Sequence, residues 1–259
     1  MNRMLWRFAW LCTLGAVAVW AVPASAQTTE VKEKPPMYSY IGFWAIPRAQ
    51  WGAMAKSDEA DRAVLDKAMA SGTIVAYGND ENLVHTADGE THDGWWSAMS
   101  MAGLLNVLNT FYTNGSSTSP VLTSATKHWD AIFVSRYYNW HSGAWKGVYS
   151  AGGIYKLKKH APDGAVDMLS KNILVPFFEK QLADGNIHEY EIDTEAIHTE
   201  APGTFYIVYI ASNAEAIDKI HAALMDYIKA NPLAVQAFDS MTDDKDHRDF
   251  LDLTNATFK

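Results

Sequence analysis

Two histidines in this sequence lie where a pair of imidazoles could do chemistry together. His85 and His198 are each followed by threonine and occupy matching places in two similar segments. If they converge, they could hold one ligand or one metal ion. Two histidines without a nearby carboxylate pattern are a weak signal for a metal, so we predict no metal site. The alternative is that each His-Thr pair ends a strand and hydrogen-bonds the following turn.

The densest group of aromatic residues and histidines is HWDAIFVSRYYNWHSGAW, at positions 128–145. On a strand, Arg136, Tyr138 and Trp140 would share one face, and a cation beside two rings could grip a planar or anionic ligand. His141 follows directly. The alternative is that these rings fill the core and that Arg136 pairs with a carboxylate.

Tyr77 and Tyr190 have the same separation in the sequence as His85 and His198. Their hydroxyls could face a cavity, although such residues are more often core rings with a satisfied tip. The candidate ligand-binding residues are therefore His85, His198, Arg136, Tyr138, Trp140, His141, Tyr77 and Tyr190.

Familiar catalytic signatures are missing. The chain has no GxGxxG, no Walker loop, no GxSxG and no HExxH, which disfavours nucleotide-dependent and hydrolytic chemistry. His221 flanks an apolar helical stripe and is typical of a packing residue. The acidic segment TDDKDHRDFLDL, at 242–253, lacks the DxDxDG register of a calcium loop.

The histidines and tyrosines belong to an internal repeat. ASGTIVAYGNDENLVHT, at 70–86, aligns without a gap on ADGNIHEYEIDTEAIHT, at 183–199. We call the constant separation between the two aligned blocks, which takes His85 to His198, the repeat spacing. A match of this length can arise by chance, but strand, helix, strand, strand, helix and strand patterns recur in the same order around both blocks. We therefore predict a duplicated unit.

This order resembles the ferredoxin-like unit, and two such units in tandem resemble the dimeric α+β barrel superfamily within one chain. The superfamily includes antibiotic-biosynthesis-type monooxygenases and haem-binding chlorite dismutases. The resemblance implies an α+β fold in which two βαββαβ units enclose a cavity, with helices outside. It also makes haem a possible cofactor, with His85, His198 or His141 opposite Arg136. No family motif is present, so no functional residues are carried over.

The expected organisation has four parts. Residues 1–26 read as a signal peptide, with basic residues, an apolar run and a small-residue cleavage site near Ala26. The first ferredoxin-like unit covers 27–141 and contains a Ser/Thr-rich loop at 113–126. The second unit covers 142–241, with a short final strand near 235–238. The acidic tail, 242–259, is expected to form a short docking helix.

Composition narrows the partners. The net charge of −9 disfavours nucleic acid, and no segment after the signal is long and apolar enough to span a membrane. The only cysteine, Cys12, lies in the signal, so no disulfide is expected. We expect export, to the periplasm or the extracellular space.

The sequence does not reveal a reaction. The main expectation is a protein that binds a small apolar or aromatic molecule in the barrel cavity. The alternative is a cofactor-poor or haem-dependent monooxygenase-like enzyme, and a second alternative is a structural protein whose barrel is filled by its own side chains.

Overall fold

The computed structural model describes residues 31–86 and 89–259. The predicted signal peptide lies outside these ranges, so its prediction is not tested here. Within the described ranges, none of the helices has the length and apolar character needed to cross a membrane. Residues 31–259 form one compact unit. The predicted boundaries inside that unit, at 141/142 and 241/242, stay predictions.

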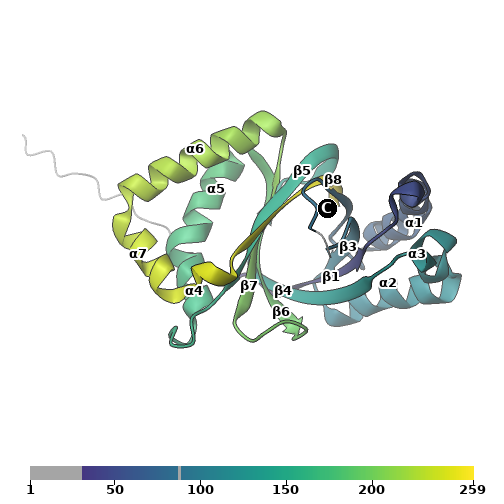
Figure 1. Ribbon diagram of the computed structural model, residues 1–259, viewed down its shortest axis with the longest axis horizontal. Coiled ribbons are helices and arrows are strands. Elements are labelled where there is room, and N and C mark those ends of the chain that lie inside the picture. The colour runs from purple at the N-terminus through teal and green to yellow at the C-terminus, as the bar shows by residue number, and fades with distance from the viewer. Residues whose placement is uncertain (1–30, 87–88) are drawn as a thin grey trace, which may run out of the picture. The chain divides into compact units, whose positions relative to one another are not determined.

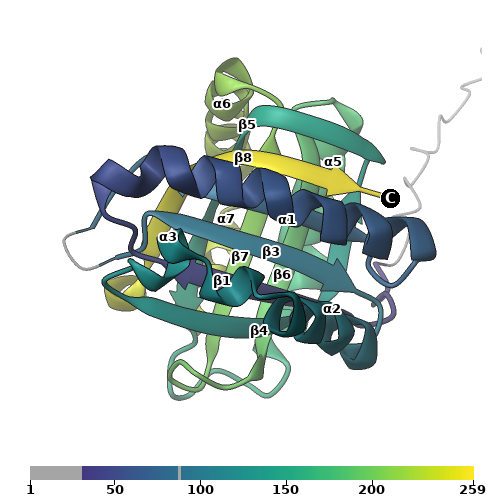
Figure 2. The ribbon, with the colours of Figure 1, turned by 90° about the vertical axis from the view of Figure 1, so that its right-hand side faces the viewer.

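Eight antiparallel strands close into a barrel (Figures 1 and 2). The order around the barrel is β1-β3-β2-β8-β5-β7-β6-β4. We call residues 37–140, with four strands, the first half, and residues 143–258, with the other four, the second half. The strands are β1 (Met37–Trp44), β2 (Ala76–Asn82), β3 (His92–Ala98), β4 (His128–Trp140), β5 (Gly143–Lys156), β6 (Ile187–Ile197), β7 (Thr204–Ala211) and β8 (Arg248–Phe258).

Helices cover the barrel from outside in two groups, one for each half (Figure 1). The first group is α1 (Trp51–Ser71), α2 (Met101–Asn114) and α3 (Pro120–Thr123). The second is α4 (Ala165–Leu169), α5 (Val175–Ala183), α6 (Ala214–Ala230) and α7 (Pro232–Met241). Short 3-10 turns occur at Arg48–Gln50, Ser116–Thr118 and Asp244–Asp246. Separate apolar cores lie between each helical group and the outer face of its strands.

Strand β7 illustrates how the sequence builds this arrangement. Its side chains alternate between the two faces, because successive residues of a strand point in opposite directions. Phe205 and Ile207 pack into the core beneath the helices, whereas Tyr206, Val208 and Ile210 line the barrel interior. The near-continuous apolar sequence of this strand therefore suits a strand that is covered on both faces.

The helix of the second half that contains Pro176 is interrupted, as its proline predicts. Residues Ser170–Leu174 form a π-helical turn between α4 and α5, and Pro176 lies in the first turn of α5. A proline is tolerated at that position because the amide it lacks would have no intrahelical partner.

Three predictions of secondary structure are wrong. The acidic tail is not a docking helix, because Arg248–Phe258 form β8, which pairs with β2 and β5 and closes the barrel. The strand expected near 235–238 lies within α7. The Ser/Thr-rich stretch 113–126 includes a 3-10 turn and α3. In β8, buried Asp252, Thr254, Ala256 and Phe258 alternate with partly exposed residues, a period of two that its polar composition concealed.

Candidate functional site

Among the cavities in the described part of the chain, three lie inside the barrel or against its outer face. The barrel cavity, inside the strands, has a volume of about 120 Å³. The first outer cavity, about 500 Å³, lies between the strands of the first half and helices α1 to α3. The second outer cavity, about 570 Å³, lies between the strands of the second half and helices α5 to α7.

The first outer cavity has aromatic walls. Tyr40 and Trp96 project outward from neighbouring strands and stack, with ring centroids 4.3 Å apart and planes at 23°. Trp44, Phe111 and Tyr112 extend this lining, and residues of the 3-10 turn Ser116–Thr118 lie at its edge. Flat, polarisable walls of this kind suit a planar aromatic molecule.

Helix α1 supplies ionisable groups to the same cavity. The carboxyl group of Asp58 is half-buried, and burial together with the neighbouring charge of Asp61 raises its pKa to about 7, while Arg62 lowers it. The side-chain amide of Asn79 lies 3.4 Å from Asp58 Oδ2 as a donor. A carboxyl group with this pKa in an aromatic pocket can exchange protons at neutral pH.

A second polar group lies across the cavity. The Tyr40 hydroxyl donates to Asp130 Oδ1 at 2.5 Å, and His128 Nε2 lies 3.4 Å from the same oxygen. His128 Nδ1 donates to the Phe43 carbonyl at 2.9 Å, because a carbonyl can only accept. The imidazole also stacks on Trp44 at 4.9 Å. These contacts fix the orientation of Tyr40 and His128 at the cavity wall.

The second outer cavity is mainly apolar, lined by aromatic and aliphatic residues such as Phe177, Tyr209, Leu224 and Phe238. Haem is the cofactor that the sequence resemblance implied, and it needs an axial ligand and basic residues for its propionates. Two histidines line it: His247 pairs with Asp249 at 2.8 Å, and His221 is exposed on α6. The described lining also contains Asp239 and Asp249 but no arginine or lysine to pair with the haem propionates. These residues do not fit haem.

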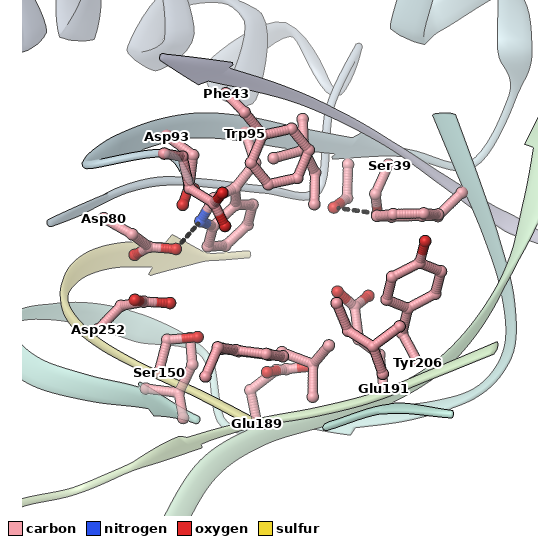
Figure 3. Close-up of a pocket in the computed structure, with 18 of the residues that line it drawn as sticks. Ser39, Phe43, Asp80, Asp93, Trp95, Ser150, Glu189, Glu191, Tyr206 and Asp252 are labelled. Atoms are coloured by element: carbon pink, nitrogen blue, oxygen red, sulfur yellow. Dashed lines mark hydrogen bonds between the residues drawn. The ribbon is translucent and has the colours of Figure 1, made fainter. Parts of the chain in front are cut away.

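The barrel cavity is acidic (Figure 3). Asp80, Asp93 and Asp252 gather on one side of it, and Glu189 and Glu191 lie along β6. Burial raises the pKa of Asp80 to about 6, that of Glu191 to about 7 and that of Asp252 to about 8. Burial also raises the pKa of Asp93 and of Glu189 well above the ordinary values.

None of the eight residues proposed from the sequence lines the barrel cavity. His85 and His198 are exposed beyond the ends of β2 and β6, and His85 contacts the Trp51 ring at 5.5 Å. His141 is exposed, with Nε2 3.1 Å from the Leu182 carbonyl at the end of α5. The expected convergence of these histidines on one central void is therefore not found.

The two tyrosines of the repeat project away from the barrel interior, under the helices. The Tyr77 hydroxyl donates to Asp66 on α1 at 2.5 Å, and the Tyr190 hydroxyl donates to Glu179 on α5 at 2.6 Å. Both rings are buried in the cores, and Tyr77 also contributes to the wall of the first outer cavity. Tyr190 therefore agrees with the alternative interpretation, a core ring whose hydroxyl is hydrogen-bonded.

The prediction that Arg136 shares a strand face with Tyr138 and Trp140 is wrong. The register of β4 against β6 shifts between Ser135 and Tyr137, which leaves Arg136 at a β-bulge. A bulge inserts one residue and reverses the alternation beyond it. Tyr138 and Trp140 do stack, at 5.5 Å, but Arg136 is exposed and pairs with Glu33 at 3.4 Å.

Sequence reasoning missed the carboxylates that line these cavities. Asp58, Asp80, Asp93 and Asp252 carry no motif and come from four separate elements. One available signal was a period of two in the acidic residues of a strand. In EYEIDTE of β6 a carboxylate recurs at every second position, so these side chains share one face, and Glu189 and Glu191 face the barrel cavity.

Comparisons with known proteins give fold relatives only. No family model matches the chain, and no curated protein matches its sequence. A "putative monooxygenase" from Lactobacillus acidophilus is 13% identical, with a TM-score of 0.62 over 86% of this chain and 97% of that one. A second, from Fusobacterium nucleatum, is 8% identical, with a TM-score of 0.64 over 87% and 95%. An anthrone oxidase-like protein is 10% identical, with a TM-score of 0.53 over 86% and 92%.

These relatives correct the main functional expectation. We expected a protein that binds a small apolar or aromatic molecule, whereas two of these structures are each described as a "putative monooxygenase" and the third as an anthrone oxidase-like protein. The enzyme alternative is therefore the better one. By its fold, an α+β barrel of eight strands with helices outside, this chain is similar to these structures, as the resemblance to the dimeric α+β barrel superfamily predicts.

Proposed function

We propose that this protein is an enzyme that oxidises a small planar aromatic substrate in the first outer cavity, with dissolved O₂ as the oxidant. The observation that carries this proposal is Asp58, a half-buried carboxylate with a pKa raised to about 7 in a cavity walled by aromatic rings. The residues of the second outer cavity do not fit haem, and the oxidation proposed for the first outer cavity is the cofactor-poor form of the enzyme alternative.

The proposed reaction starts with proton abstraction. Above pH 7, Asp58 is mostly ionised and can take a proton from a phenol or from an activated C–H group such as that of an anthrone. The resulting anion is electron-rich and can react with O₂. Oxidation of a CH₂ group to a carbonyl consumes one O₂ and releases one water, so the balance needs no other reductant.

The other groups of the cavity would position the substrate. Arg62 lies on the same wall as Asp58 and favours a substrate anion. Tyr40, held by Asp130, offers a ring that can stack on the substrate together with Trp96. Water exclusion by the aromatic walls would strengthen both effects.

Purified protein and a panel of anthrones and naphthols, followed by an oxygen electrode and by absorbance, test the proposal. We expect O₂ uptake that is lost when Leu108→Trp fills the first outer cavity. Leu224→Trp, which fills the second outer cavity instead, is the matched control and should retain activity. No O₂ uptake with any compound, or equal rates in the two variants, would overturn the proposal.

The tandem ferredoxin-like organisation is proposed on three observations. In each half the strands follow the order fourth, first, third, second. The Tyr77–Asp66 hydrogen bond corresponds to the Tyr190–Glu179 hydrogen bond, because the repeat spacing separates both the donors and the acceptors. Cross-strand pairs match too, since Tyr77 opposes Trp96 and Tyr190 opposes Tyr209. Gene duplication accounts for all three.

Export also stays a proposal, because it depends on residues outside the described ranges. The signal-like composition of residues 1–26 supports it. Mass spectrometry of protein recovered from the native host should give a mature chain that starts at Gln27. A chain that retains Met1 would contradict it.

A further inference from the structure

We propose that the barrel cavity holds a divalent cation, bound by the carboxylates of Asp80, Asp93 and Asp252 and by the side-chain oxygen of Asn82. This site is separate from the first outer cavity and does not depend on the proposed oxidation. No sequence motif indicates this site, because its four ligands come from three separate strands.

The three carboxylates meet because three neighbouring strands place them there. Asp80 on β2 is directly opposite Asp93 on β3, and Asn82 on β2 is directly opposite Asp252 on β8. One ligand atom from each aspartate lies within 4.8 Å of the others, and all three residues are buried. A single ion can therefore contact all of them, and Figure 3 shows the three side chains facing the same space.

Two oxygens at this place have no partner. Asn82 donates from Nδ2 to Asp252 Oδ1 at 2.9 Å, but its own Oδ1 is buried and accepts no hydrogen bond from any described residue. Asp80 accepts from the Trp95 indole through Oδ2 at 3.2 Å, and its Oδ1 is likewise unpartnered within the described ranges. Buried acceptors normally have a partner, and a cation would supply one to both.

The negative charges of the three buried aspartates also favour a bound cation. Like charges directly opposite each other on adjacent strands are destabilising, and burial increases the penalty. The described lining of the barrel cavity contains no lysine or arginine that could compensate three aspartates. Either protons or a cation must neutralise them. A carboxyl proton would supply a donor to one acceptor, whereas a single cation can contact several oxygens at once, including the unpartnered amide oxygen of Asn82.

The donor atoms define the class of ion. All four are oxygens, three from carboxylates and one from an amide, which is the ligand set of Ca²⁺, Mg²⁺ or Mn²⁺ rather than of Zn²⁺ or Cu²⁺. The cavity volume of about 120 Å³ leaves room for water molecules to complete the coordination shell.

The second half lacks this combination at the matching place. Asp193 on β6 corresponds to Asp80 by the repeat spacing, but it is opposite Tyr206 instead of an aspartate. Glu195, which corresponds to Asn82, is opposite Phe133 instead of Asp252. Asp193 also accepts a hydrogen bond from Ser135. This gives a matched control for the proposed site.

The test is cation binding after EDTA treatment, measured at pH 8 by calorimetry and by melting temperature with Ca²⁺, Mg²⁺ and Mn²⁺. We expect one ion per chain and a higher melting temperature for at least one of the three. Asp93→Asn, Asp252→Asn and Asn82→Ala should each weaken binding by roughly tenfold or more. Asp193→Asn should bind as the unmodified protein does, and circular dichroism checks that every variant is folded.

Trp95 provides an independent readout, since its indole contacts Asp80. Tb³⁺ bound at the site should show luminescence sensitised by tryptophan, and Ca²⁺ or Mn²⁺ should displace it. Trp95→Phe should lose most of this emission while calorimetry still detects the ion. The proposal is overturned if none of the three cations binds at millimolar concentration, or if Asp93→Asn and Asp252→Asn bind equally well as the unmodified protein. The proposal is also overturned if 1,4-diaminobutane binds and none of the three metal ions does. The cavity would then be assigned to an organic ammonium ligand.

Discussion

The two halves of the molecule share a framework and differ in what they do with it. In both, a helix-covered cavity lies outside the barrel, and matched positions line the two cavities: Leu65 with Phe178, Trp96 with Tyr209 and Phe111 with Leu224. The first half adds Asp58, Asp61 and Arg62 to its cavity, whereas the second is mainly apolar. The framework therefore fixes where a cavity forms, and a few charged residues decide which cavity can do acid-base chemistry.

The barrel interior repeats this contrast. On the β3-β2-β8 side, Asp80 is opposite Asp93, whereas on the β7-β6-β4 side Asp193 is opposite Tyr206. One substitution in a matched position changes an acid pair into an acid and a phenol. The directly opposed aspartates therefore lie in the first half, whereas Glu189, Glu191 and Asp193 of β6 have no aspartate opposite them.

The largest effect that should separate the two outer cavities is the loss of the proposed base. Asp58→Asn keeps the shape of the side chain and removes its ability to accept a proton, so we expect kcat to fall by about 100-fold or more. Asp239→Asn, in the second outer cavity, is the control and should leave kcat unchanged. Steady-state O₂ uptake measures both, and a normal kcat in Asp58→Asn would remove the distinction between the cavities.

The pH profile should sharpen the same comparison. Because Asp58 must be ionised to act as a base, kcat/KM should rise with pH and level off above about 7. Arg62 lowers the pKa of Asp58, so Arg62→Met should move the midpoint upward; Asp61 raises that pKa, so Asp61→Asn should move it downward.

Exposed Lys67, which does not line the cavity, gives the control variant Lys67→Met with an unchanged midpoint. Shifts of the same sign for Arg62→Met and Asp61→Asn would exclude Asp58 as the titrating group.

The acid pair inside the barrel makes a prediction about stability. The pKa values of Asp80, Asp93 and Asp252 are raised in the folded state, so the folded protein holds more protons than the unfolded one between about pH 4 and 8. Without divalent cations, stability should therefore fall as pH rises through this range, by more than about 3 °C in melting temperature.

Asp93→Asn should flatten this slope, because it removes the charge opposite Asp80. Asp193→Asn should also flatten it, because burial and the charge of Glu191 raise the pKa of Asp193. Differential scanning calorimetry in EDTA at pH 5.5 and 8.5 compares both variants with the unmodified protein. An unchanged slope in Asp93→Asn would contradict the contribution of the acid pair.

How far the sequence predicts this molecule depends on whether the signal is local. The order of strands and helices up to α6 follows from hydrophobic period and from Pro176, which are properties of neighbouring residues. β8 was missed because Thr242 and the acidic residues that follow it suggest the cap and first turn of a helix, and only pairing with β2 and β5 makes Arg248–Phe258 a strand.

The site depends on distant contacts, which explains why its prediction failed. The bulge at Arg136 is a property of the pairing of β4 with β6, and it moves that side chain off the face of Tyr138. Asp80, Asp93 and Asp252 become a cluster only when the barrel closes between β2 and β8. Histidines attracted attention by residue type, whereas the carboxylates gain unusual properties only from burial.

The smallest predicted effect concerns the helix caps, and it tests whether the repeat spacing has structural meaning. The Ser100 hydroxyl accepts from the Gly103 amide at the start of α2, and the Asn213 side chain accepts from the Ala216 amide at the start of α6. Ser212 immediately precedes this cap, whereas Asn213 corresponds to Ser100 by the repeat spacing. Ser100→Ala and Asn213→Ala should each cost about 1 kcal/mol, because an N-cap satisfies an amide that has no intrahelical partner. Ser212→Ala should cost almost nothing in the same urea titration, and a larger loss for Ser212→Ala than for Asn213→Ala would break the correspondence between the two halves.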